Sequence, residues 1–377
     1  MLAAGTIAQA SFSAITVGLA VLAPVLREEY GLSLAQIGAL LSAAWLGAVV
    51  SLLPWGLAAD RYGERVVLAL GLFGAAAFLA GAAEADSFGA LFALLVLAGA
   101  SGASVNSASG RAVMLWFAPS ERGLALGIRQ TAIPLGGLIV AIVVPSLAAS
   151  GGSRAAFFFL AALAALGGVV GLLVIRGRDG ADELEAASVV VTLRDGRLWR
   201  LSLSSGLYLY AQVAVIGFGV LFLHDDHGLD DQDAALVIAA SQVLAIVLRI
   251  GAGRWSDVVG SRVGPLRRVG LAVAASLVLT ALLAEGPLWA LVPVLAVAGG
   301  LSMAWNGLSF TAAAELAGAA RTGAAIGFQQ SVLSGIGVLA PVVFAITVSS
   351  GSWAIAFALA AILPLAGWRG LRPLRSY

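Results

Sequence analysis

Long apolar stretches dominate this chain and limit what it can fold into. Hydrophobic residues make up 60% of its 377 residues, charged residues only 11%, and the mean hydropathy is +1.01. A soluble domain could not bury that much apolar surface, so a lipid bilayer must surround it, and inside lipid only helices can satisfy a backbone of this kind. We predict an all-α polytopic membrane protein with twelve transmembrane helices, at residues 3–26, 35–57, 66–83, 88–115, 123–148, 154–175, 201–223, 233–253, 268–284, 288–314, 323–348 and 353–368.

A short pattern of glycine, aspartate, glycine and arginine occurs twice and indicates two related halves. The copies are Gly56, Asp60, Gly63 and Arg65 in residues 56–65, and Gly253, Asp257, Gly260 and Arg262 in residues 253–262, with an offset of 197 positions. Each copy follows a long apolar run. Internal repeats in a membrane protein are typical of secondary transporters. We therefore predict two pseudo-symmetric six-helix halves, residues 1–175 and 201–377, joined by a polar linker at 176–200.

The arginines predict how the chain is oriented. All 21 basic residues are arginine, and most of them fall in alternate loops and in the linker. The loops on the opposite side hold only Arg27 and Arg154. Because cytoplasmic loops carry the excess of positive charge, we expect both termini and the linker to lie in the cytoplasm, with the chain in the cell (inner) membrane. The first apolar run has neither the short core nor the basic start of a cleavable signal peptide, so it is interpreted as a span.

The first copy of the pattern resembles the signature loop of the major facilitator superfamily. That signature is Gly-x-Leu-x-Asp-Arg-x-Gly-Arg-Arg, between the second and third spans. The matching residues are Gly56, Asp60, Arg61, Gly63 and Arg65, whereas Ala58 and Glu64 depart from the pattern. The copy after span 8 matches at Gly253, Asp257, Gly260 and Arg262. The resemblance covers the whole chain and implies alternating access by two rocking halves, without indicating the substrate.

The resemblance also implies a gate at the signature loop. An aspartate there can accept hydrogen bonds from the first N–H groups of a facing helix, where the helix dipole favours an anion. In the family the partner of the first loop is span 11, which here begins at residues 322–323. We expect Asp60 and Arg111 to form part of this gate. Because the second copy departs further from the family pattern, we expect Asp257→Asn to be the milder substitution.

A second repeat, at an offset of 200, supplies candidates for the substrate site. It aligns Asn106 with Asn306 and Gln130 with Gln330. In the family, spans 1, 4, 7 and 10 surround the central cavity, and spans 2, 5, 8 and 11 flank it. An amide that faced lipid would be left without partners, so Gln130, Gln330 and Gln212 are expected to face the cavity. Asn106 and Asn306 are expected near the middle of the bilayer on spans 4 and 10. Residues 134–137 in span 5, Pro-Leu-Gly-Gly, resemble half of an antiporter motif, and we favour close helix packing as their role.

Ionisable groups inside the bilayer are costly and usually functional, so their inventory bears on the mechanism. Every Asp, Glu and His falls near a membrane surface, which leaves no group at mid-depth to carry a proton. Arg129 and Arg249 lie within spans 5 and 8. They either snorkel to the cytoplasmic interface, with Asp257 or Glu315 as the partner of Arg249, or they face the cavity without a fixed counter-charge. In the second case the substrate supplies the negative charge, so we predict a small organic or inorganic anion.

Several other classes of protein are disfavoured. The chain has no cysteine, and no metal cluster, nucleophile–base pair or phosphate-binding loop occurs in any span, so we expect neither an enzyme nor a bound cofactor or metal. His224 and His227 belong to an acidic loop that we interpret as solvated. The net charge of +1 gives no reason to expect nucleic acid. We expect a monomer that binds lipid and a small molecule. The alternatives are a proton-coupled efflux carrier for drugs or other amphiphiles, and a sensor that does not transport.

Overall fold

The computed structural model describes residues 2–105, 124, 128, 130–174, 192–318 and 321–374. The helices of the first half are α1 (Leu2–Val21), α2 (Ala23–Tyr30), α3 (Leu34–Tyr62), α4 (Glu64–Ala82), α5 (Phe88–Gly102) and α8 (Ala132–Val174). Those of the second half are α10 (Gly196–Gln212), α11 (Phe218–His227), α12 (Asp231–Val259), α13 (Val263–Leu282), α14 (Leu288–Ser302), α15 (Trp305–Ala317), α16 (Thr322–Ser350) and α17 (Trp353–Gly370).

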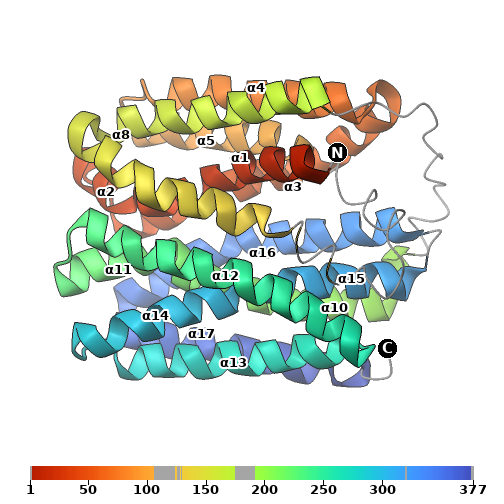
Figure 1. Ribbon diagram of the computed structural model, residues 1–377. Coiled ribbons are helices and arrows are strands. Elements are labelled where there is room, and N and C mark those ends of the chain that lie inside the picture. The colour runs from red at the N-terminus through yellow and green to blue at the C-terminus, as the bar shows by residue number, and fades with distance from the viewer. Residues whose placement is uncertain are drawn as a thin grey trace.

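These helices form the predicted twelve-span fold of two six-helix halves. Within the described ranges, nine helices are long and apolar enough to cross a membrane, and the bent pair α1 and α2 adds a tenth span. The long α8 contains two spans, because Gly151 and Gly152 have non-helical backbone angles between them. The shorter α5 contributes the described part of span 4. Figure 1 shows the two halves stacked with their helices roughly parallel, and both chain termini at the same end of the bundle.

Among the described helices, three spans are interrupted, and each interruption has a local cause or consequence. Span 1 bends by 56° at Leu22, just before α2, which has Pro24 in its first turn. Span 7 passes through a π-helical turn at Val213–Gly217 between α10 and α11. Span 10 breaks at Met303 and Ala304, between α14 and α15. Such breaks leave backbone carbonyl groups without helical partners, so side chains from neighbouring helices can bind them.

The predicted linker at 176–200 falls mostly outside the described residues. Its last part is helical, because α10 begins at Gly196 with Asp195 as its N-cap. The Asp195 side chain accepts a hydrogen bond from the backbone N–H of Arg197. The Arg197 guanidinium also donates to it, and this hydrogen bonding lowers the pKa of the Asp195 carboxyl. The boundaries at 175 and 201 otherwise stay a prediction.

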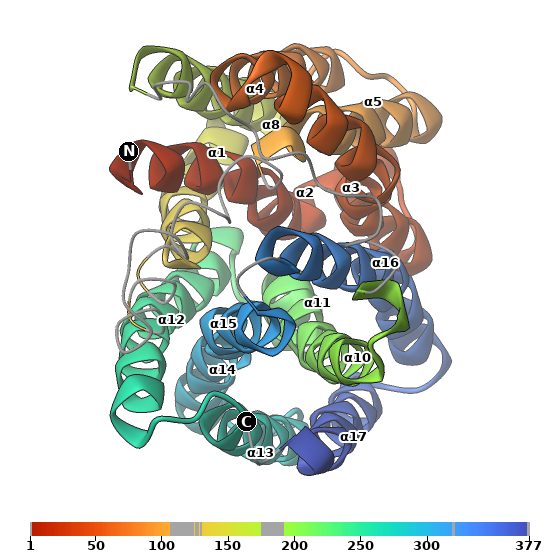
Figure 2. The same cartoon turned by 90° about the vertical axis from the view of Figure 1, so that its right-hand side faces the viewer.

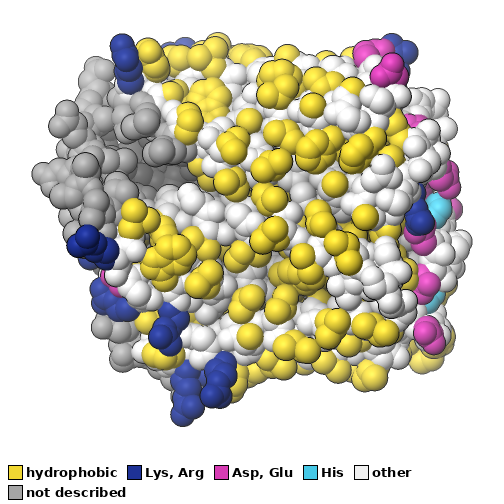
Figure 3. Space-filling model, turned by 180° about the vertical axis from the view of Figure 1, so that it is seen from behind, with side chains coloured by type: hydrophobic (Ala, Val, Ile, Leu, Met, Phe, Trp, Pro, Cys, Tyr) yellow, Lys and Arg dark blue, Asp and Glu magenta, His cyan; other side chains and the backbone are white. Residues whose placement is uncertain are grey.

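Charged side chains mark the two ends of the bundle. Figure 3 shows a broad apolar band on one face, with arginines at one end and carboxylates and histidines at the other. We call the first the arginine-rich end, which includes Arg254, Arg268 and Arg369. The second is the acidic end, which includes Glu28 and Glu84. The apolar band matches the surface that a bilayer would cover.

Among the described helices, the pairs α3–α16 and α8–α12 make the most extensive contacts between the halves, and glycines allow both to pack closely. In the first pair, a Cβ atom on Gly38 of α3 would lie 2.8 Å from the carbonyl oxygen of Pro341 in α16. Likewise, a Cβ atom on Gly337 of α16 would lie 2.5 Å from the Trp45 ring of α3. In the second pair, Gly137 of α8 faces Gln242 of α12 in the same way. Figure 2 shows α16 of the second half beside α3 of the first.

A close helix contact inside the first half generates a test. A Cβ atom on Gly99 of α5 would lie 2.3 Å from the carbonyl oxygen of Ala44 in α3, so Gly99→Ala must push these helices apart. We expect a lower melting temperature in detergent. The matched control is Gly89→Ala, which meets open space in the same helix and should be neutral or slightly stabilising, because alanine favours helix by about 1 kcal/mol over glycine. Equal melting temperatures for both variants would contradict the close contact.

Candidate functional site: a polar seam between the halves

Arg249 of α12 is buried at the interface between the halves. Only 1% of its surface is exposed, and its guanidinium donates three hydrogen bonds. Nε donates to the carbonyl oxygen of Met303 at 2.7 Å, and Nη2 donates to Oδ1 of Asn306 at 2.7 Å. Nη1 donates to the carbonyl oxygen of Gln130, which lies just before α8 in the other half. Arg249 therefore joins both halves through its side chain.

The sequence makes both of the backbone carbonyl groups available. In an α-helix the carbonyl of residue i accepts from the N–H of residue i+4. Residue i+4 from Gln130 is Pro134, which has no N–H, so the helix offers no donor to the Gln130 carbonyl. Met303 lies at the break between α14 and α15. Arg249 binds where a proline and a broken helix leave carbonyl oxygens free.

The oxygens around Arg249 are all uncharged. In the part of the chain that the structure describes, no carboxylate lies within ion-pair distance of this guanidinium. The interpretation that Arg249 snorkels toward Asp257 or Glu315 is therefore wrong, because both acids bind Arg262 instead. Val259 ends α12 ten residues after Arg249, which places Arg249 about 15 Å from that end. Arg249 is thus a buried cation that binds only neutral groups in the described part of the chain.

The second copy of the signature forms a network at the arginine-rich end. The Arg262 guanidinium forms an ion pair with Asp257, donates to Ser256 Oγ at 2.8 Å and reaches Glu315 of α15 at 3.1 Å. The other oxygen of Asp257, Oδ2, accepts from the backbone N–H of Leu124 at 2.8 Å. Gly260 caps the C-terminus of α12 in a left-handed conformation, with φ of 66°, which allows the chain to turn back toward Arg262.

The Asp257 contact crosses from one half to the other. Leu124 lies at the start of predicted span 5, so Asp257 binds there as Asp60 is predicted to bind the start of span 11. The expectation that Asp257→Asn is the milder substitution rests on the sequence pattern and does not take this contact into account. Gly253, the first residue of that copy, is buried on the same helix.

The first copy is described only in part. Gly63, with φ of 80°, separates α3 from α4, and Gly56 is half-buried in α3. Arg61 and Arg65 are exposed, and Arg61 lies over the Tyr62 ring. The Asp60 side chain lies outside the described part of the structure. Its role in the gate therefore stays a prediction.

Three other predicted residues lie outside the described part of the chain, namely Asn106, Arg111 and Arg129. The structure places the rest as follows. Gln130 and Asn306 meet at Arg249, although Gln130 does so through its carbonyl group. Gln330 is half-buried, whereas its neighbour Gln329 is fully buried and donates to Ser309 Oγ at 2.5 Å. The repeat could have indicated Gln329, because it aligns with Arg129.

Three pairs of contacts give the register between predicted span 5, which continues into α8, and α12. Leu124 meets Asp257, Gln130 meets Arg249, and Gly137 meets Gln242. The position numbers rise along one helix as they fall along the other, so the two helices are antiparallel. We call this interface, residues 124–137 against 242–257, the polar seam. On α12 the seam includes Asp257, Arg249 and Gln242. Successive members of this set are eight and seven residues apart, or about two helical turns, so the three residues lie near one face of the helix.

At the acidic end, ionic contacts also cross between the halves. Arg27 of α2 forms an ion pair with Asp225 of α11, and His224 Nε2 lies 3.7 Å from Glu28. In the described residues no group of three or more metal-ligating side chains occurs.

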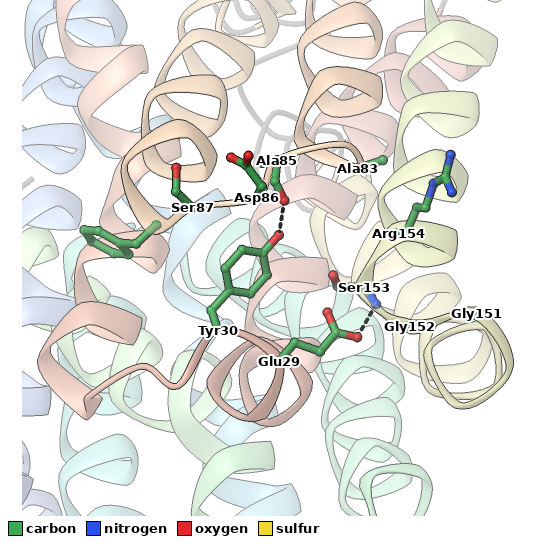
Figure 4. Close-up of a pocket in the computed structure, with 11 residues that line it drawn as sticks. Glu29, Tyr30, Ala83, Ala85, Asp86, Ser87, Gly151, Gly152, Ser153 and Arg154 are labelled. Atoms are coloured by element: carbon green, nitrogen blue, oxygen red, sulfur yellow. Dashed lines mark hydrogen bonds between the residues drawn. The ribbon is translucent and has the colours of Figure 1, made fainter.

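A pocket of about 530 Å³ opens at the same end within the first half. Figure 4 shows Glu29 accepting from the Ser153 N–H at 2.9 Å and Tyr30 donating to the Ala85 carbonyl at 2.7 Å. These bonds fix α2 against the loops of its own half. The pocket contains none of the predicted site residues.

The Asp257 contact can be tested with a cysteine probe, because the natural chain has no cysteine. Ala252→Cys would place a thiol at a buried position between Arg249 and Asp257. We expect Asp257→Asn to increase the rate at which maleimide labels this thiol severalfold, because the neutral amide holds a helix N-terminus more weakly than a carboxylate does. Arg254→Gln, on the exposed face of α12, serves as the control and should leave the rate unchanged. Equal rates in the parent and in Asp257→Asn would contradict a closing role.

Comparisons with known proteins agree with this architecture. A family model of the Major Facilitator Superfamily matches residues 2–341. An uncharacterized MFS-type transporter from Mycobacterium tuberculosis is 35% identical over 354 residues, which cover 93% of this chain and 79% of that protein. A probable nitrate/nitrite antiporter from Thermus thermophilus is 30% identical over 268 residues, or 64% of this chain and 57% of that protein.

A solved structure supports the same fold. The crystal structure of the human organic anion transporter MFSD10 aligns with a TM-score of 0.77 over 98% of both chains, at 18% sequence identity. That likeness concerns the fold alone. The family and the curated relatives are transporters and not enzymes. Together with the repeated signature loop and the twelve-span fold, these matches show that the chain belongs to the major facilitator superfamily.

Proposed function

We propose that this transporter moves a small anion across the cytoplasmic membrane by secondary active transport, with Arg249 as the cation that binds it. The observation that carries the proposal is the buried Arg249 guanidinium, which binds only neutral oxygens in the described part of the chain. Burying an ion costs several kcal/mol, which these hydrogen bonds offset in part. An arriving anion would add the missing opposite charge.

The position of Arg249 suits alternating access. Its hydrogen bonds join Gln130 of the first half to Met303 and Asn306 of the second. An anion that replaces one of these oxygens would change how strongly the halves hold together. A ligand can shift a conformational equilibrium only through such a difference between states. Arg129, the second cation predicted from the sequence, is proposed to contribute from span 5.

Contacts at the two ends of the bundle provide the proposed gates. The Arg27–Asp225 pair holds the acidic end closed, and the Asp257–Leu124 contact holds the arginine-rich end. When the halves rock about a central site, one set must break while the other holds. The Arg27–Asp225 pair is partly exposed and can break at modest cost, whereas the Asp257 side chain is buried, so opening the arginine-rich end costs more.

The name of one relative agrees with an anionic substrate. The protein from Thermus thermophilus is described as a probable nitrate/nitrite antiporter. The proton-coupled alternative has less support. Glu315 is ion-paired with Arg262 near the arginine-rich end of the bundle. No described contact of Arg249 involves an acid that could exchange a proton with it.

We further propose the orientation in which the arginine-rich end faces the cytoplasm. The positive-inside rule then places both termini and the linker at 176–200 inside the cell. The halves at 1–175 and 201–377 would move as units, and one chain contains both, so a monomer can carry out the whole cycle.

Substitutions of Arg249 test the anion proposal. A guanidinium binds carboxylate or nitrate with two parallel hydrogen bonds, which lysine cannot reproduce. We expect Arg249→Lys to impair anion uptake into proteoliposomes and Arg249→Gln to weaken anion binding about a hundredfold, as loss of a charged hydrogen-bonding partner suggests. The probes are nitrate, phosphate and six-carbon carboxylates. Arg254→Gln, which changes the same charge on an exposed face, serves as the control.

The same uptake and binding measurements can contradict the anion proposal. If Arg249→Gln transports as well as the parent protein and the best ligands prove neutral or cationic, the anion proposal fails. The efflux of amphiphiles would then be the better explanation.

A further inference from the structure

Gln242 is a second polar residue of the seam that the anion proposal leaves without a role. It lies on α12 and none of its surface is exposed. Neither Oε1 nor Nε2 has a hydrogen-bond partner among the described residues. The amide lies against Gly137 of α8, where a Cβ atom would come within 2.7 Å of its Cδ atom. The glycine therefore leaves room for an amide that has no hydrogen-bond partner among the described residues.

Leaving a buried amide unpaired is unfavourable. Each unsatisfied donor or acceptor costs about 1–3 kcal/mol, whereas a leucine of similar volume would pack at this position without that cost. The neighbouring Ser241 shows the usual solution, because its buried hydroxyl donates to the Val237 carbonyl of its own helix at 3.1 Å. Gln242 has no such local partner, so its amide is available to a ligand that enters the seam.

The geometry of α12 sets the spacing between Gln242 and Arg249 along the polar seam. Gln242 and Arg249 lie seven residues apart on nearly the same face of α12, about 10 Å along the helix axis. Both face the opposite half, Gln242 at Gly137 of α8 and Arg249 at Gln130 just before it, and that half moves when the halves rock. A nitrate or phosphate ion is too small to contact both side chains at this separation. A molecule with a chain of several atoms between its charged end and a polar group can contact both.

We propose that Gln242 binds an uncharged hydrogen-bonding group of the substrate while Arg249 binds its anionic group. The substrate is then an elongated organic anion with hydroxyl or amide groups, rather than a small inorganic anion. The Oε1 atom accepts from a ligand hydroxyl or N–H, and Nε2 donates to a ligand oxygen. This inference rests on the proposed anion transport and names the substrate class of that same site.

The test compares three anions that differ in one property at a time. Gluconate and hexanoate are six-carbon carboxylates with and without hydroxyl groups, and nitrate carries the charge alone. Binding to the purified full-length protein in detergent is measured from the shift in melting temperature with ligand concentration. We expect the parent protein to bind gluconate more tightly than hexanoate or nitrate.

Two variants remove the amide contact and one serves as the control. We expect Gln242→Leu to weaken gluconate binding about tenfold, as the loss of two neutral hydrogen bonds suggests, while binding of hexanoate stays unchanged. Gly137→Ala should act in the same direction, because its methyl group displaces the amide. Ser241→Ala removes a hydroxyl that is already satisfied within α12 and should not change the gluconate preference. Without ligand, Gln242→Leu should raise the melting temperature.

The possible results distinguish a failure of the Gln242 proposal from a failure of the anion-transport proposal. If Arg249→Gln abolishes binding of all three anions but Gln242→Leu leaves the gluconate preference intact, Gln242 does not bind substrate and anion transport still stands. If nitrate binds the parent as tightly as gluconate, the elongated substrate is wrong. If no anion raises the melting temperature, both the inference and the proposed function fail.

Discussion

A guanidinium inside a bilayer needs oxygens to replace the water that it has lost, and this requirement organises the centre of the protein. Arg249 obtains them from three separate places: a carbonyl that Pro134 leaves without a helical donor, the break between α14 and α15, and the Asn306 amide. None of these oxygens carries a charge. The protein thus stabilises the cation well enough to fold, yet leaves its electrostatic attraction for an anion in place.

The same interface must hold together and also come apart. Glycines allow α3 to approach α16 closely, and α8 to approach α12, so dispersion contacts form over small, smooth surfaces. Polar bonds are added at a few points, at Asp257 and Leu124, at Arg249 and Gln130, and at Arg27 and Asp225. A few directional bonds give distinct closed arrangements, and a ligand that competes for one of them can favour another arrangement.

Hydropathy and the two internal repeats predict the spans and the two halves, because membrane thickness sets helix length and duplication preserves spacing. The sequence also places no acidic residue at mid-depth, and for that reason Arg249 can be identified as a candidate site residue from the sequence. The sequence cannot give the rotation of each helix, which decides which neighbours meet. Gln329 and not Gln330 is fully buried, a difference of one residue and about 100° around the helix. The partners of Gln130 and Gln242 depend on a register between halves that no local pattern encodes.

Distances across the polar seam, with and without an anion, test the account most directly. Spin labels on cysteines at Ile128 and Val258 report the arginine-rich end, and labels at Ser146 and Leu236 report the acidic end; all four positions are exposed. We expect an anion to shift the two distance distributions in opposite directions and Arg249→Gln to remove this response. Distances that move together, or that respond equally in Arg249→Gln, would contradict it.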